Sequence, residues 1–197
     1  ADWSHFIGNM SYLLLLVPML ENAGANVLLP RERDCQTAEI IIDNDGCLNT
    51  NSTYTEHTAD KVWRQGTGKG FAHLRPQYID FENPFKEGTF RIAETVKKGK
   101  ESTAEWIPEI PQNGQYAVYV SYQTVPNSSD DALYTVYHKG GVSQFKVNQK
   151  MGGGTWVYLG TFGFDAGKSN ACKVTLSNRS AKAGQTVTAD AVKIGGG

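Results

Sequence analysis

Histidine, cysteine and carboxylate side chains are the groups best able to do chemistry in this chain, and their spacing forms no catalytic motif. The histidines are His5, His57, His73 and His138. None of them shares a His-x-x-x-His spacing, and the three cysteines form no Cys-x-x-Cys pair. We therefore predict no catalytic residue and no zinc site in this chain, and no enzymatic activity of its own.

Two other segments imitate functional motifs. Residues 66–70 read Gly-Thr-Gly-Lys-Gly, but the Gly-Lys-Ser/Thr ending of a phosphate-binding loop is missing. Glu101, Glu105 and Glu109 are spaced by four, as a pair of acid–base carboxylates could be. They lie in a strand-like stretch bounded by prolines, where solvation at the surface is the ordinary explanation.

A short acidic segment is the candidate cation site. Asp43-Asn44-Asp45-Gly46 resembles the start of a calcium loop, although no glutamate follows at the far end of that pattern. Asp43 and Asp45 are thus candidate ligands of a structural calcium ion, and a plain turn is the alternative. No other cofactor is predicted.

Aromatic and amide side chains are the candidates for ligand binding. A sugar ring can stack on an aromatic face while amides bind its hydroxyl groups. We take Trp63, Tyr122 and Tyr137 as candidate stacking residues and Asn148 and Gln149 as candidate amides. The alternative is that alternating aromatics fill a core. We expect that core role for Trp106 and Trp156, whereas for Tyr122, at a strand end, exposure and burial stay equally open.

Charge and hydropathy exclude two classes of partner. The net charge is −1, and the basic residues cluster only at Lys97-Lys98-Gly99-Lys100, so nucleic-acid binding is not predicted. The apolar run at residues 10–18 is too short to span a membrane and is predicted to be a buried helix. A Cys35–Cys47 bridge stays open, and Cys172 alternates with apolar residues as a buried thiol would.

The elements that must position these residues are mostly β-strands. Residues 1–38 have the pattern of a helix followed by a short strand, and residues 39–197 read as a separate β-domain. Within the second part, regular strands begin near residue 104 at the spacing of a β-sandwich. The expected strands are 104–107, 115–122, 133–138, 142–148, 156–164, 173–178 and 187–194.

Several motifs in order across residues 105–194 resemble the golvesin / xanthan-lyase C-terminal-type domain. They are Gly114-Gln115-Tyr116-Ala117-Val118-Tyr119-Val120-Ser121-Tyr122, Ala132-Leu133-Tyr134-Thr135-Val136-Tyr137-His138, Val147-Asn148-Gln149, Trp156-Val157-Tyr158-Leu159-Gly160-Thr161-Phe162 and Ala189-Asp190-Ala191-Val192. The resemblance implies a mainly-β fold, a galactose-binding-like jelly-roll β-sandwich, preceded here by a short N-terminal α/β fragment.

The leading segment resembles part of an N-acetylmuramoyl-L-alanine amidase-like domain. The resemblance rests on residues 18–27 and on Pro30-Arg31-Glu32-Arg33-Asp34. That family holds zinc through residues spread over its whole domain, and none of them maps onto this chain.

Together these patterns predict a non-catalytic module that binds polysaccharide or peptidoglycan glycan. The resemblances imply a secreted, periplasmic or cell-surface bacterial protein that also carries an attached catalytic domain. Two alternatives stay open. The chain could be part of a zinc-dependent peptidoglycan amidase whose catalytic residues lie elsewhere, or a structural spacer or protein-interaction domain.

Overall fold

The computed structural model describes residues 39–47, 51–72 and 82–195 of the chain. Residues 1–38, on which the predicted helix–strand fragment falls, lie outside the described residues. Among the described residues no helix is long and apolar enough to cross a membrane.

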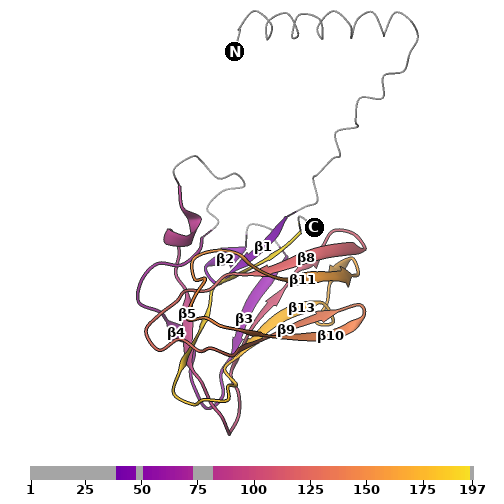
Figure 1. Cartoon of the computed structure of the whole chain (residues 1–197). Helices are drawn as coiled ribbons and strands as arrows, with labels where there is room; N and C mark the ends of the chain where they lie inside the picture. The colour runs from indigo at the N-terminus through magenta and orange to yellow at the C-terminus, as the bar shows by residue number, and fades with distance from the viewer. Residues whose placement is uncertain (1–38, 48–50, 73–81, 196–197) are drawn as a thin grey trace, which may run out of the picture. The chain divides into compact units, whose positions relative to one another are not determined.

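Two five-stranded antiparallel sheets form the body of the domain. In spatial order the first sheet consists of β11 (Val157–Phe164), β8 (Gly114–Val120), β15 (Ala191–Ile194), β1 (Ile40–Asp43) and β2 (Gly46–Cys47). The second consists of β10 (Gly141–Val147), β9 (Ala132–His138), β13 (Lys173–Ser177), β6 (Thr103–Ile107) and β3 (Thr53–His57). In Figure 1, β8 and β11 run along one side of the domain and β9, β10 and β13 along the other.

Two smaller sheets complete the strand inventory of the described residues. One consists of β14 (Thr186–Ala189), β5 (Arg91–Glu94) and β4 (Arg64–Gln65), and the other of β12 (Gly167–Lys168) and β7 (Glu109–Ile110). The 3₁₀ turn η1 (Pro84–Lys86) is capped by the Asn83 side chain, which accepts a hydrogen bond from the Phe85 N–H. The predicted mainly-β sandwich is confirmed.

The core lies between the two large sheets because their strands alternate apolar and polar residues. On β8, Tyr116, Val118 and Val120 point inward. From the second sheet, Trp106 and Tyr134 are fully buried against them. Period-two alternation buries every second side chain, so each sheet keeps one face for the core and one for its surroundings.

One predicted strand is wrong as a single element. Residues 187–194 were expected to form one strand, but the chain leaves the ladder at Asp190, between β14 and β15. β14 pairs with β5, whereas β15 pairs with β1 and β8. The Asp190 carboxylate accepts the Phe71 N–H at 3.1 Å, from a loop far away in the sequence.

The turn and thiol predictions are confirmed where the structure describes them. Residues 43–46 form the β1–β2 hairpin turn, with Gly46 at φ 141°. Cys172 is a buried free thiol, and Cys47 is a half-buried free thiol. Cys35 lies outside the described residues.

Candidate functional site

Three of the five predicted ligand-binding side chains are buried. Trp63 and Tyr122 are 3% and 2% exposed, and Gln149 has no exposed surface. Both aromatic rings belong to the main core. For Tyr122 the structure thus decides for burial between the two possibilities that the sequence left open, and Trp63 and Gln149 are also enclosed by the protein.

Tyr122, Asn148 and Gln149 are nevertheless brought together by the structure, and they build a loop. The Tyr122 hydroxyl donates to the carbonyl oxygen of Met151 at 2.8 Å and lies 3.4 Å from that of Asn148. Gln149 donates to the Thr188 carbonyl oxygen and accepts from the Thr188 N–H, both at 2.8 Å. These bonds satisfy buried polar atoms and hold the 148–154 loop in place.

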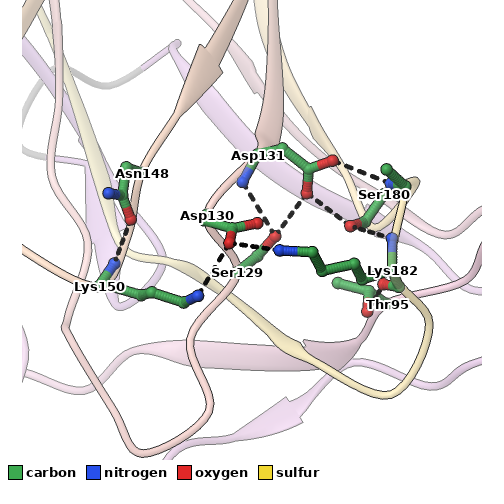
Figure 2. Close-up of polar contacts among 9 residues, drawn as sticks. Thr95, Ser129, Asp130, Asp131, Asn148, Lys150, Ser180 and Lys182 are labelled. Carbon is green, nitrogen blue, oxygen red and sulfur yellow. Dashed lines mark hydrogen bonds and ion pairs between the residues drawn. The ribbon is translucent and has the colours of Figure 1, made fainter.

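A network of ion pairs and hydrogen bonds joins this loop to two others at the same end of the domain (Figure 2). Asp130 accepts from Lys150 at 2.8 Å and from Lys182 at 2.7 Å, and these two lysines hold the pKa of Asp130 down at about 2. The neighbouring Asp131 accepts from the hydroxyls of Ser129 and Ser180. Because each carboxylate is already occupied, this network is better suited to fastening loops than to binding a ligand.

The two remaining predicted residues are more accessible. Asn148 is exposed, and its side-chain oxygen accepts the N–H of Lys150 at 3.1 Å. Tyr137 is half-buried on the outer face of the second sheet, where the Lys173 ammonium lies 5.3 Å from its ring centre. The five predicted residues therefore do not form one surface.

The two predicted calcium ligands lie in different environments, one buried and one exposed. Asp43 is 3% exposed, and burial is the main reason that its pKa is raised to about 9, so it is protonated at neutral pH. Asp45 is exposed and accepts hydrogen bonds from the N–H and hydroxyl of Thr89. Within the part of the chain that the structure describes, no three His, Cys, Asp or Glu side chains gather as metal ligands would. A structural calcium stays a prediction.

The outer face of the first sheet carries a row of residues that the sequence analysis did not assemble. Tyr158 on β11 lies opposite Tyr119 on β8, Tyr119 lies opposite Lys193 on β15, and Lys193 lies opposite Ile41 on β1. The row thus crosses four neighbouring strands at one level. Directly opposed side chains on one face are close enough to contact each other.

The rings of this row lie side by side. The ring centres of Tyr119 and Tyr158 are 5.3 Å apart, and Tyr158 is 55% exposed. The Lys193 ammonium lies 4.6 Å from the Tyr119 ring centre and 5.3 Å from that of Trp156. We call Tyr158, Tyr119 and Trp156, with Lys193 between them, the aromatic face.

A small apolar cluster packs against the Trp156 ring. Its ring centre lies 5.0 Å from that of Phe71 and 5.6 Å from that of Phe85, and Ile41 and Ala191 belong to the same cluster. The expectation that Trp156 is a core residue is only partly met, because it is half-buried and lies outside the main core. Trp106, in contrast, is fully buried as expected.

Charge at the aromatic face is balanced. Lys193 pairs with Glu39 at 3.0 Å, and the Tyr158 hydroxyl shares a hydrogen bond with the Thr161 hydroxyl at 2.8 Å. The arrangement offers ring faces, hydroxyl groups and one ammonium on an open sheet. Such a surface is suited to stacking and hydrogen bonding, and it contains no nucleophile beside a base.

The alternation of inward and outward side chains along the strands could have revealed this face. Tyr119 shares its side of β8 with the exposed Gln115, and Lys193 stands between Val192 and Ile194. A side chain that alternates out of phase with the core residues must point away from the core.

Comparison with known proteins now gives the family. The family model of the golvesin C-terminal domain matches the sequence over residues 84–196. This chain belongs to the golvesin C-terminal domain family. The matched segment contains Tyr119, Trp156, Tyr158 and Lys193. It does not contain residues 18–34, so the amidase resemblance stays a prediction.

Xanthan lyases are among the proteins similar to this golvesin C-terminal domain. The xanthan lyase of Bacillus sp. (strain GL1) is 33% identical over 96 residues, which cover 49% of this chain and 10% of that protein. The solved structure of a Paenibacillus xanthan lyase matches 80% of this chain and 13% of its own chain, with 25% identity and a TM-score of 0.57. The present chain thus corresponds to about a tenth of the length of these lyases.

Proposed function

We propose that this golvesin C-terminal domain is a non-catalytic module that binds polysaccharide and holds an attached glycan-active protein near its substrate. The observation that carries the proposal is the pairing of the exposed Tyr158 ring with the half-buried Tyr119 ring on the outer face of the first sheet, at 5.3 Å between ring centres. The similarity to xanthan lyases supports a glycan as the ligand.

The chemistry of the aromatic face fits a sugar. The C–H groups of a pyranose ring form an apolar face that stacks on tyrosine or tryptophan, while its rim of hydroxyl groups needs donors and acceptors. Tyr158, Thr161 and Lys193 supply such polar groups beside the rings. An extended chain of sugars would lie across the aromatic face, over Tyr158, Tyr119 and Trp156.

The proposal includes a location outside the cytoplasm, as a secreted, periplasmic or cell-surface protein, because peptidoglycan and exported polysaccharides are found there. Peptidoglycan glycan stays a candidate ligand alongside acidic and neutral polysaccharides.

Affinity electrophoresis tests the proposal. The whole chain is run through native gels that contain xanthan, other soluble polysaccharides or no glycan, and binding to insoluble peptidoglycan is measured by sedimentation. We expect retardation by at least one glycan and weaker retardation of the Tyr158→Ala variant. If no glycan retards or sediments the wild-type chain, the domain is a spacer or interaction module instead.

A further inference from the structure

The loop between β5 and β6 presents three lysines without acidic partners. Lys97, Lys98 and Lys100 are all exposed. Ion pairs occur at other lysines of the described residues, such as Lys61 with Glu94 and Lys173 with Glu105, but at none of these three.

The backbone of this loop is held in one conformation. The Arg179 guanidinium donates to the carbonyl oxygens of Lys97, at 3.2 Å, and Gly99, at 2.7 Å. On the other side, the Lys100 N–H donates to the Asp60 carboxylate at 2.9 Å. Gly99 has φ 95°, and a Cβ there would lie 2.3 Å from that carboxylate, so the close approach requires glycine.

The acidic side chains beside this loop bond to groups other than the three lysine ammonium groups. Asp60 accepts the Lys100 backbone N–H, and Glu101 accepts from the Ser177 hydroxyl and pairs with Arg179. The positive charge of Lys97, Lys98 and Lys100 is therefore left facing solvent. A fixed loop that carries unpaired ammonium groups attracts anions with little further loss of backbone entropy on binding.

We infer that the 97–100 loop binds the carboxylate groups of an acidic polysaccharide. The inference rests on the proposed glycan-binding function and gives it a substrate class. The aromatic face, where Lys193 is already paired, would stack the sugar rings. The 97–100 loop would favour chains that bear carboxylates. A polysaccharide is favoured over a nucleic acid because the chain has a net charge of −1, whereas nucleic-acid binders carry extended basic surfaces.

Two polymers with the same backbone distinguish binding through charge from binding through ring stacking. Polygalacturonate and its methyl ester differ only in whether the carboxylates are free. Binding of both is measured by isothermal titration calorimetry for the whole wild-type chain, for the K97A/K98A/K100A variant, and for K69A/K146A/K168A as a control. The control removes three exposed lysines at other places, so its net charge changes equally.

The expected result is that wild type binds the free acid more tightly than the ester, with an affinity that falls as salt rises from about 20 to about 500 mM. The loop variant should bind the free acid about tenfold more weakly, because three exposed ion pairs between lysine and the carboxylates of the polymer are lost. Its affinity for the ester should be unchanged. The control variant should bind like wild type.

Other outcomes overturn the inference in distinct ways. Equal binding of acid and ester by wild type would keep the proposed function and reject the acidic class. Equal losses in the two triple variants would show that net charge, not this loop, attracts the polymer. Tighter binding to a DNA duplex or to anionic lipid vesicles would assign the loop to another partner. Absence of binding to both polymers and to the gel-embedded glycans would reject the proposed function itself.

Discussion

Tyr119 and Tyr158 face each other across the β8–β11 ladder, with their ring centres 5.3 Å apart on the outer side of the first sheet. Their position on the same outer face as Lys193 makes an open aromatic surface out of residues that are far apart in the sequence. Of the two rings, Tyr158 is the more exposed.

Replacing Tyr158 by alanine should weaken glycan binding about tenfold and leave the melting temperature nearly unchanged. The ring is 55% exposed, so its loss removes a stacking surface and little core contact. Tyr158→Phe should keep most of the affinity because the ring remains. Val142→Ala, which removes a 57% exposed side chain from the other sheet, is the matched control. If Val142→Ala weakened binding as much as Tyr158→Ala, the ligand would not be confined to the aromatic face.

Tyr122 should behave as a core residue. Tyr122→Ala is expected to cost about 3–5 kcal/mol of unfolding free energy, because a buried aromatic side chain is lost. Tyr122→Phe should cost only about 1 kcal/mol, for the hydrogen bond to the Met151 carbonyl oxygen. Urea denaturation measures both values. A Tyr122→Ala variant that unfolds at the wild-type urea concentration but loses glycan binding would return this ring to the ligand site.

Alanine substitutions of Gln149 and of its neighbour Asn148 should have very different effects on the free energy of unfolding. Gln149→Ala leaves the buried N–H and carbonyl oxygen of Thr188 without partners, which should cost roughly 2–4 kcal/mol. Asn148→Ala, at an exposed position, should change stability by less than about 0.5 kcal/mol. Thermal and urea unfolding compare the two. A result in the reverse order would contradict the assignment of Gln149 to the interior.

Stability should decline as the pH rises, because of two buried carboxyl groups. Burial is the main cause that raises the pKa of Asp43 from 3.8 to about 9 and that of Asp190 from 3.8 to about 7. Above pH 3.8 the unfolded chain has released these protons while the folded chain still holds them, so raising the pH lowers the unfolding free energy until each folded-state pKa is passed.

Asp43→Asn isolates the larger of these contributions. The amide cannot ionise, so the difference in unfolding free energy between about pH 5 and about pH 9 should become smaller than in wild type. Urea denaturation at several pH values measures it, and Asp165→Asn, which removes an exposed carboxylate that pairs with Lys139, is the control. An unchanged pH dependence in Asp43→Asn would mean that other groups cause the decline.

Strand alternation in the sequence determined most of the architecture. The period-two patterns of β8, β9 and β13 predicted these strands to within one or two residues at each end, because a core between two sheets demands apolar side chains at every second position. The same rule determined that Trp106 is a core residue. Pairing between strands was not determined, since it depends on partners far apart along the chain.

Tertiary structure alone decided which aromatics are covered. Tyr122 follows β8 and Trp156 precedes β11, where alternation ends and the burial of a ring depends on which loop folds over it. The 148–154 loop covers Tyr122, whereas Trp156 packs on Phe71 and Phe85 at the outer face. Likewise the break at Asp190 depends on a bond to the Phe71 N–H, 119 residues away in sequence. Local residue patterns determine which way a side chain points within a strand, but contacts from distant segments decide whether that side meets solvent.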